Sequence, residues 1–535
     1  MAETKREIER KYDVAAGAKL PDLTGVAGVV DVVGKGVVEL DAVYWDTPDQ
    51  RLAAASITLR RRTGGADAGW HLKLPVSLAE GVRDEIRAPL SDTLPRVLGG
   101  LVRSRVREGQ LVPLVRLLSA REVRHLVDTE GALLAEVSVD GVRAERLTGG
   151  GGTAEWSEIE VELADDGDPA LLDKVEKKLK KAGVRRSAST SKLGRALAET
   201  APKERKAKKA KPEGRAVRDG KKAGKSEAVA EAVAAAVGEG PGTAGDHVLA
   251  YLRAQRDAIV SLDPAVRRDL PDSVHQLRVA TRRMRSAFRT YRKILDRTVT
   301  DPVSDELKWL AGELGVDRDQ EVLTERFTAR ITALPRTLLL GPVRGRLRIW
   351  TVARRTGSRR RTVAVLDGKR YLMLLDTLDA LLAAPPLLPA AAAAPEKALP
   401  KAVLKDYARL ATRIEHALAP DAGTERDLAM HEARKAAKRA RYAGEAATPA
   451  LGAPAERFAK RMKAVQGLLG DHQDSVVARE ALRALAVQAH LAGESAFTWG
   501  LLYGQEESAA ADRERELPGV WARAAEEELR ASLGG

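Results

Sequence analysis

Two stretches in the C-terminal half of the chain repeat one spacing of basic side chains, and this repeat constrains the fold more than any other feature. In each stretch a histidine precedes three basic residues at spacings of three, four and three: His275, Arg278, Arg282 and Arg285, then His431, Arg434, Lys438 and Arg441. A second matched set follows in register: Lys308, Gly312, Leu314, Gly315, Asp319 and Val322, then Lys463, Gly467, Leu469, Gly470, Asp474 and Val477. Such a duplication predicts a half built from two copies of one unit.

Composition divides the chain into three parts. Residues 1–200 alternate apolar and polar side chains between glycine-rich turns, which predicts an antiparallel sheet with attached helices. Residues 201–244 form a basic linker, and we expect it to be disordered because positions 201–226 carry eleven Lys or Arg against three acids. Residues 245–530 have helical composition, and a Pro/Ala-rich break separates a first repeat at about 245–384 from a second at about 400–530.

Net charge and composition limit the chemical classes of partner that the protein is expected to bind. The formal net charge of +14 favours polyanions, whereas an aromatic content of 4% disfavours nucleic-acid binders that stack bases. We therefore expect an anion recognised through its phosphates, with nucleic acid disfavoured and left open. The absence of cysteine excludes disulfides and zinc–thiolate sites. Charged residues near the start and prolines in the longest apolar stretch predict a cytoplasmic protein without a membrane segment.

Several stretches of the N-terminal part carry charged residues at every second position, which places these side chains on one face of a strand. Glu7, Glu9 and Lys11 alternate with other residues, as do Arg60 and Arg62. Lys73 lies in a further alternating stretch, and three acids alternate in a late one: Glu158, Glu160 and Glu162. A sheet that collects acids and bases on its polar face predicts a closed barrel with a charged interior. The acids would bind Mg²⁺ or Mn²⁺, and the bases would bind phosphate oxygens.

These stretches resemble the CYTH family of triphosphate tunnel metalloenzymes over about residues 3–200. The resemblance rests on residues 7–11, 44–47, 59–62, 70–75, 136–140, 158–162 and 191–193. It implies an α+β domain with an eight-stranded antiparallel β-tunnel, metal ligands at Glu7, Glu9, Asp140, Glu158 and Glu160, and phosphate ligands at Lys11, Arg60, Arg62, Lys73, Arg124 and Lys192. Arg121 competes with Arg124 for one role, and Glu162 competes with Glu158.

Members of the CYTH family cyclise ATP, cleave thiamine triphosphate or hydrolyse inorganic tripolyphosphate. The N-terminal sequence shows no signal for recognising a base, which favours the inorganic substrate and predicts a Mg²⁺- or Mn²⁺-dependent inorganic triphosphatase. Two alternatives stay open. One is a nucleoside or thiamine triphosphate-processing enzyme, and the other is a non-catalytic protein that binds polyphosphate or its granules.

In the first repeat the basic residues form a stripe along one helix. At 100° per residue, His275, Arg278, Arg282, Arg285 and Arg289 fall within an arc of about 80°. Apolar side chains occupy the opposite side: Leu277, Ala280, Met284, Phe288 and Tyr291. Like charges at this spacing repel each other, and a bound polyanion would offset the repulsion. A solvated basic face and a histidine metal site are the alternatives.

The C-terminal part resembles the CHAD domain over about residues 245–530. The resemblance rests on residues 274–285, on 430–441 and on two Leu-Gly-x-x-x-Asp segments, which we expect to be turns. It implies an all-α domain of two pseudo-repeated four-helix bundles that binds inorganic polyphosphate in a basic groove between them. The predicted ligands are the two repeated sets together with Arg289, Lys435, Lys308 and Lys463. Lys438 replaces Arg282 of the first repeat, which removes the planar guanidinium at that position. The sequence does not determine an oligomeric state.

Overall fold

A computed structural model describes residues 3–76, 81–202, 242–355, 358–419 and 423–534. The chain divides into two compact units, Met1–Val217 and Arg218–Gly535. Most of the predicted linker lies outside the described residues, so its disorder stays a prediction. None of the helices in the described ranges combines the length and apolar character needed to cross a bilayer.

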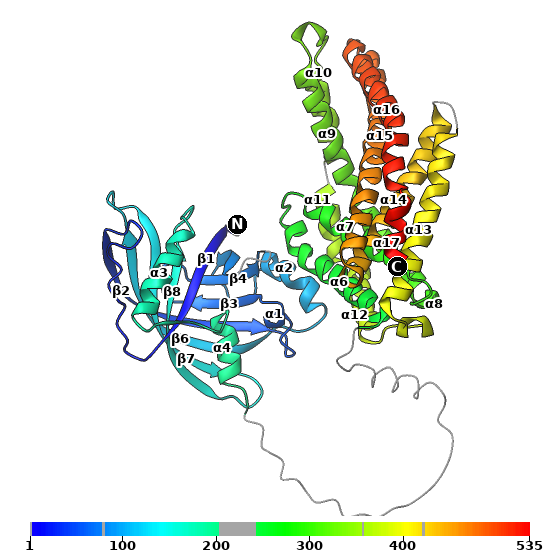
Figure 1. The fold of residues 1–535 in the computed structure, drawn as a ribbon. Helices are drawn as coiled ribbons and strands as arrows, with labels where there is room; N and C mark the ends of the chain where they lie inside the picture. The colour runs from blue at the N-terminus through cyan, green and yellow to red at the C-terminus, as the bar shows by residue number, and fades with distance from the viewer. Residues whose placement is uncertain (1–2, 77–80, 203–241, 356–357, 420–422, 535) are drawn as a thin grey trace, which may run out of the picture. The chain divides into compact units, whose positions relative to one another are not determined.

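The first unit is a closed antiparallel barrel (Figure 1). Its strands are β1 (Glu3–Val14), β2 (Asp31–Asp46), β3 (Thr58–Thr63), β4 (Gly69–Pro75), β5 (Val82–Pro89), β6 (Val112–Val127), β7 (Leu133–Arg146) and β8 (Thr153–Leu163). They pair in the order β5-β4-β3-β2-β6-β7-β8-β1, and β1 also pairs with β5, which closes the ring. A two-residue strand, β9 (Arg185–Arg186), adds to β1. The predicted eight-stranded antiparallel tunnel is confirmed.

The barrel carries its apolar side chains on the outside, where helices cover them. In β8, Ile159 and Val161 pack against α3 (Ala170–Lys181), while Glu160 between them faces inward. The helices α1 (Arg51–Ala54) and α2 (Arg96–Val106) cover the apolar face of β3, β4 and β5. A fourth helix, α4 (Lys192–Glu199), packs through Leu193 and Ala196 beside Trp156. Period-two alternation therefore leaves the interior free for charged groups.

The second unit is helical. Its helices are α6 (Ala244–Arg267), α7 (Ser273–Thr290), α8 (Arg297–Glu313), α9 (Gly315–Ala333), α10 (Val343–Arg355), α11 (Ser358–Asp367), α12 (Lys369–Ala383), α13 (Pro395–Leu418), α14 (Thr424–Leu451), α15 (Ala453–Leu491), α16 (Phe497–Ala524) and α17 (Glu527–Gly534). Two short 3-10 turns, Arg336–Leu338 and Pro389–Ala392, join them. The all-α prediction is confirmed.

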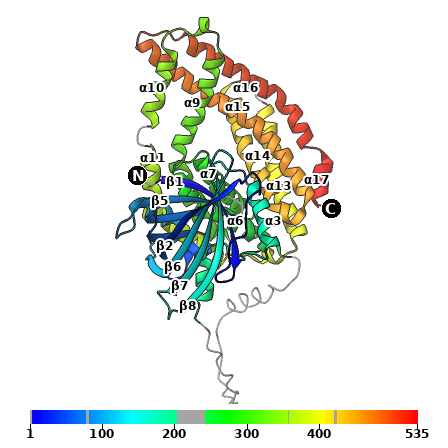
Figure 2. The ribbon, with the colours of Figure 1, turned by 90° about the vertical axis from the view of Figure 1, so that its left-hand side faces the viewer.

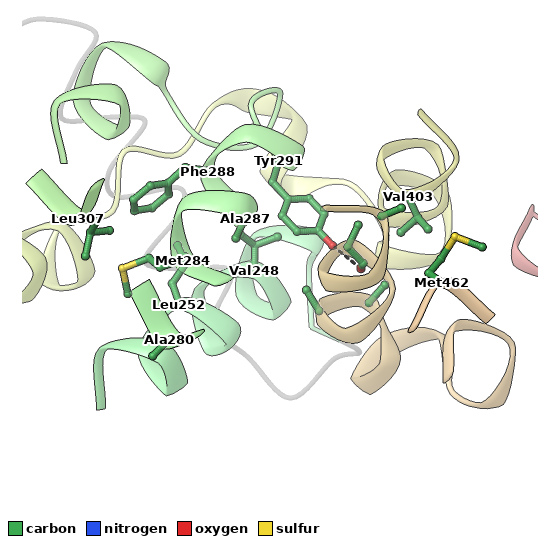
Figure 3. Packing of buried hydrophobic residues seen from close by; sticks show 14 of the residues in the cluster. Val248, Leu252, Ala280, Met284, Ala287, Phe288, Tyr291, Leu307, Val403 and Met462 are labelled. Atoms are coloured by element: carbon green, nitrogen blue, oxygen red, sulfur yellow. Dashed lines mark hydrogen bonds between the residues drawn. The ribbon is translucent and has the colours of Figure 1, made fainter. Parts of the chain in front are cut away.

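The main helical core contains side chains from both repeats (Figure 3). Met284 and Phe288 of α7 belong to the same cluster as Val403 of α13 and Met462 of α15. The hydroxyl of Tyr291, which follows α7, donates a hydrogen bond to the carbonyl oxygen of Ala443 in α14 at 3.2 Å. Because the two repeats share one core, the division into two four-helix bundles stays a prediction.

A second, smaller core joins α9 and α10 to the far halves of α15 and α16, which extend together in Figure 2. Phe327 and Trp350 come from the first repeat, and Leu482 and Trp499 come from the second. The ring centroids of Phe327 and Trp350 lie 6.0 Å apart. This core lengthens the bundle beyond the helices that carry the histidines.

The second predicted Leu-Gly-x-x-x-Asp turn is wrong, whereas in the first only Leu314 forms a turn and the rest is helical. Gly470 lies inside the continuous helix α15, and Gly315 begins α9 directly after Leu314, the residue that follows α8. Glycine is a poor helix former, which is why the sequence favoured a turn. In both repeats an arginine guanidinium lies close to the glycine, Arg278 at Gly315 and Arg434 at Gly470.

Candidate functional site

The barrel encloses a charged cavity of about 240 Å³. Eight predicted site residues line it: Glu7, Glu9, Lys11, Arg60, Arg62, Lys73, Glu160 and Lys192. Further charged or polar lining residues include Lys5, Tyr44, Asp67, Arg83, Glu85, Arg87, Arg121 and Glu162. The cavity thus mixes cation-binding and anion-binding groups at contact distance.

Strand β1 supplies two buried carboxylates with opposite electrostatic surroundings. Burial raises the pKa of Glu7 to about 7, although the nearby ammonium of Lys73 opposes this shift. Burial also disfavours ionised Glu9, but Lys11 and Lys73 outweigh it and lower the pKa of Glu9 to about 2. The Lys11 ammonium lies 3.2 Å from a Glu9 oxygen and also contacts Glu160. Two acids on one strand are therefore held in different charge environments.

A basic group on β3 and β4 faces β1 and is organised by Glu85 of β5. The Arg60 guanidinium lies 3.3 Å from the Tyr44 hydroxyl and 3.5 Å from a Glu85 oxygen. The Lys73 ammonium lies 3.9 Å from the same Glu85 oxygen, and His71 Nδ1 lies 3.0 Å from it. The predicted site set omitted Glu85 and Tyr44. Alternation of Arg83, Glu85 and Arg87 along β5 was the signal for Glu85.

At another part of the barrel, three buried acids surround one ammonium. Asp140 of β7 and Glu158 and Glu160 of β8 each offer an oxygen within 4.8 Å of the others. Lys192 Nζ lies 2.9 Å from Asp140, 2.7 Å from Glu158 and 2.6 Å from Glu160. The indole nitrogen of Trp156 donates a hydrogen bond to the second Glu158 oxygen at 2.6 Å. This group, called the acid triad below, is the densest cluster of carboxylates in the barrel interior described by the structure.

The helical unit contains a groove of about 640 Å³ between the two histidine helices. It collects seven predicted ligands: His275, Arg278, Arg282, His431, Arg434, Lys438 and Arg441. Helices α7 and α14 meet through Arg282, whose Nε donates a hydrogen bond to the Tyr442 hydroxyl at 2.9 Å. Arg283 and Arg326 also line the groove, and sequence reasoning omitted both.

Comparison with known proteins identifies the two units. A family model for the CYTH domain matches residues 5–197, and one for the CHAD domain matches residues 250–483. The chain is a CYTH–CHAD protein. Two uncharacterized proteins of Mycobacterium tuberculosis, Rv2226 of strain H37Rv and MT2285 of strain CDC 1551, are each 38% identical to it over 528 residues. Each alignment covers 95% of this chain and 94% of the relative.

Solved structures similar to parts of the chain include PptA from Streptomyces chartreusis, with 22% identity, a TM-score of 0.44, and coverage of 52% of this chain and 99% of PptA. The CHAD domain from the plant Ricinus communis has 23% identity and a TM-score of 0.37, and the match covers 55% of this chain and 92% of the plant domain. HpAC1 from Hippeastrum has 20% identity and a TM-score of 0.23, and the match covers 36% of this chain and 95% of HpAC1.

The structure separates Arg121 from Arg124 in the CYTH domain. Arg121 donates two hydrogen bonds of 2.8 Å to Asp140 and one of 2.6 Å to Glu160, and it lines the cavity. Arg124 lies three residues further along β6, on the opposite face, where it pairs with Glu122. The predicted phosphate ligand Arg124 therefore lies away from the other predicted ligands. Glu158 and Glu162 both face inward, Glu158 in the acid triad and Glu162 beside Lys5 at 2.7 Å.

The acid triad fits a hard divalent cation. Its donors are carboxylate oxygens, which Mg²⁺ and Mn²⁺ prefer, and the side chains are almost fully buried. Glu158 Oε1 is buried and lies 2.7 Å from the Lys192 ammonium, so this oxygen already contacts a cation. Glu7 and Glu9 line the cavity together with Glu160 of the triad, and Glu7 Oε2 contacts the Lys73 ammonium. CYTH domains belong to a superfamily of metal-dependent enzymes, and these residues could hold the metal.

Five predicted phosphate ligands of the CHAD domain lie outside the lining of the groove: Arg285, Arg289, Lys435, Lys308 and Lys463. Arg285 is half-buried, and burial lowers its pKa, with a further contribution from Arg289. Lys435 is exposed and pairs with Glu432. Lys308 and Lys463 are exposed on α8 and α15. In α7 the basic stripe extends past the lining of the groove, which accounts for Arg285 and Arg289.

Lys438 has an unusual environment in the groove. Burial lowers its pKa to about 7, and the guanidinium groups of Arg434 and Arg282 add to the shift. Asp474, also in the groove, has a pKa raised by burial, although Arg434 at 3.7 Å opposes this. The groove therefore concentrates more positive charge than its own acids neutralise.

Proposed function

We propose that the CYTH domain hydrolyses inorganic tripolyphosphate with Mg²⁺ or Mn²⁺, and that the CHAD domain binds inorganic polyphosphate. The observation that carries the first part is the cavity, whose lining combines Glu160 of the acid triad and the two β1 carboxylates with Arg60, Arg62 and Lys73. Carboxylates suit metal ions, and fixed guanidinium and ammonium groups suit phosphate oxygens. A cavity that provides both supports phosphoanhydride chemistry.

The residues of the chain would act mainly by positioning charge. Tyr44 and Glu85 hold the Arg60 guanidinium, so its donors are oriented before substrate enters. Lys73 and Lys11 would bind further phosphate oxygens as point charges. A divalent cation bound at the acids would neutralise charge on the phosphates. Water is the simplest nucleophile for the resulting hydrolysis.

The lining of the cavity supports an inorganic substrate. Charged side chains dominate it, and Tyr44, the aromatic residue among the described lining, is buried and bound to Arg60. A nucleoside or thiamine group needs an apolar or stacking surface, as most small-molecule sites provide. Tripolyphosphate needs none. A nucleoside or thiamine triphosphate remains the alternative substrate class.

The CHAD groove supports polyphosphate binding because it joins basic groups from both repeats. Arg278 and Arg282 come from α7, while Arg434 and Arg441 come from α14. Such a row is unfavourable alone and is neutralised by a linear polyanion that releases counterions. A protein that only binds polyphosphate or its granules is the second candidate function, and it would keep this groove without turnover in the barrel.

A substrate panel tests the enzyme. Phosphate release is measured from tripolyphosphate, long polyphosphate, ATP and thiamine triphosphate, each with Mg²⁺ and with Mn²⁺. We expect tripolyphosphate to be hydrolysed fastest, and the Glu7→Ala, Glu9→Ala double variant to lose about a hundredfold or more. Glu155→Ala, which removes an exposed acid on β8, is the matched control and should keep full activity. Absence of metal-dependent turnover on all four compounds would leave only binding.

Equilibrium binding of long polyphosphate tests the CHAD groove. The Arg278→Ala, Arg282→Ala, Arg434→Ala triple variant should lose at least about a hundredfold in affinity. Its control removes three exposed lysines outside the groove, Lys369, Lys397 and Lys401. Unchanged affinity in the groove variant would refute the assignment. Equal affinity for single-stranded DNA at the same salt concentration would favour a general polyanion binder.

A further inference from the structure

Lys192 lies at the junction of a helix and the acid triad. It is the first residue of α4, and Ser191 caps that helix by accepting a hydrogen bond from the Gly194 amide at 3.0 Å. Packing anchors the helix outside the barrel, because Arg195 lies 4.9 Å from the centre of the Trp156 ring and Leu193 is buried. The backbone of Lys192 is thus held in place, while its side chain reaches inward.

The ammonium of Lys192 occupies the position that a cation needs. Its nitrogen lies 2.6–2.9 Å from one oxygen of each acid in the triad. These are short ion pairs between one ammonium and three carboxylates, and the ammonium is buried with them. Lys192 therefore neutralises the triad in the way that a bound cation would.

The local charges balance before any ion enters. The three carboxylates of the triad are matched by three cations in contact with them, Lys192, Arg121 and Lys11. A divalent cation added to this arrangement would leave two uncompensated charges in a buried site, which is costly. Withdrawal of one of the three protein cations would reduce this excess of positive charge. Lys192 is the cation in contact with all three acids of the triad, so its withdrawal would free an oxygen of each acid at once.

We propose that Lys192 competes with the divalent cation for the acid triad. Its ammonium neutralises the three carboxylates in the ion-free protein and moves into the cavity when the ion binds. There it would meet the phosphates of the substrate, so the ion would free a phosphate ligand as it binds. The last step rests on the proposed function, whereas the exchange of ammonium for metal ion does not.

Metal binding to the full chain without any phosphate compound tests the exchange. Lys192→Met keeps the length of the side chain and removes its charge. This variant should bind Mn²⁺ about tenfold or more tightly than the wild type, because no ammonium has to be displaced. Lys177→Met, at an exposed position of α3, is the control and should not change the affinity. Unchanged or weaker Mn²⁺ binding by Lys192→Met would overturn the proposal.

A measurement on the wild type covers the case in which Lys192→Met does not fold. In the ion-free protein the Lys192 amine is buried and in contact with all three acids of the triad, which protects it from acylation. Mg²⁺ should increase the labelling of Lys192 by an amine-reactive reagent at least about threefold, as measured by mass spectrometry. Labelling of Lys177 should stay constant. A fall or no change at Lys192 would contradict the exchange, whether or not the domain hydrolyses tripolyphosphate.

Discussion

Arg278 of the first repeat lies against the backbone of Gly315, where α8 ends and α9 begins. Its Nη1 donates a hydrogen bond to the Gly315 carbonyl oxygen at 3.3 Å. A Cβ atom added at Gly315 would lie 3.0 Å from Nη2 and 3.1 Å from Cζ of Arg278. The second repeat has the same pair, but a Cβ at Gly470 would lie 3.7 Å from the nearest Arg434 nitrogens. The repeated glycines thus leave room for repeated arginines.

This difference predicts unequal effects of the same substitution. Gly315→Ala should push the Arg278 guanidinium aside and lower the affinity for polyphosphate about three- to tenfold. Gly470→Ala should leave the affinity unchanged, because 3.7 Å is an ordinary contact. It should also raise the free energy of unfolding by up to about 1 kcal/mol, since alanine favours a helix. Binding titrations measure the affinity of the two variants for polyphosphate, and thermal unfolding measures their stability. Each variant serves as the control for the other.

Lys438 predicts that polyphosphate affinity depends on pH. The lowered pKa of about 7 leaves its amine largely neutral above pH 7 in the free groove and protonated below. Bound phosphate favours the protonated form, so affinity should fall as the pH rises through about 7, by at most about tenfold per pH unit. The groups facing Lys438 are Arg434, Arg282, Arg278 and Asp474. Of these, the arginines keep their charge throughout this range.

Binding of long polyphosphate measured from pH 6 to 9 checks this dependence. Lys438→Arg should flatten the profile, because guanidinium stays charged over the whole range. Lys435→Arg changes an exposed lysine three residues away and should keep the wild-type profile. A slope that survives in Lys438→Arg would assign the titration to another group.

Arg121 and Arg124 of the CYTH domain predict a contrast in stability. Arg121→Ala would leave two buried carboxylates, Asp140 and Glu160, without their guanidinium partner. We expect a loss of about 3–5 kcal/mol in the free energy of unfolding. Arg124→Ala removes a partly exposed pair with Glu122 and should cost about 1 kcal/mol or less. Urea unfolding of both variants gives the comparison, and equal losses would refute it.

Asp406 predicts a defect confined to the CHAD domain. Its buried carboxylate accepts hydrogen bonds from Thr290 at 2.5 Å, Arg409 at 2.9 Å and Arg439 at 2.9 Å, which ties α13 to α7 and α14. Asp406→Ala leaves these donors unpaired, and we expect a loss of about 3 kcal/mol or more. Calorimetry should show a lower midpoint temperature for the unfolding of the CHAD domain. The unfolding transition of the CYTH domain, recognised by its shift when Mn²⁺ is added, should be the same as in the wild type. Glu396→Ala, at an exposed position of α13, is the control.

Much of the architecture was predictable because it depends on local periodicity. The alternation of Glu7, Glu9 and Lys11 puts these side chains on one face of a strand whatever the rest of the chain does. The repeated basic spacing likewise fixes which side of α7 and α14 is charged. The strand alternation and the helical stripe required no knowledge of tertiary contacts.

Other features depended on how distant segments pair. Arg121 and Arg124 are equally basic and lie on one strand, so only the register of β6 against β7 assigns Arg121 to the interior beside Asp140. Arg285 shares the stripe with Arg282, yet Arg282 lines the groove and Arg285 does not. The sequence by itself determined which residue types share a face, because side-chain direction follows from backbone geometry. Tertiary structure alone decided which face meets which, because that choice rests on packing between segments far apart in the chain.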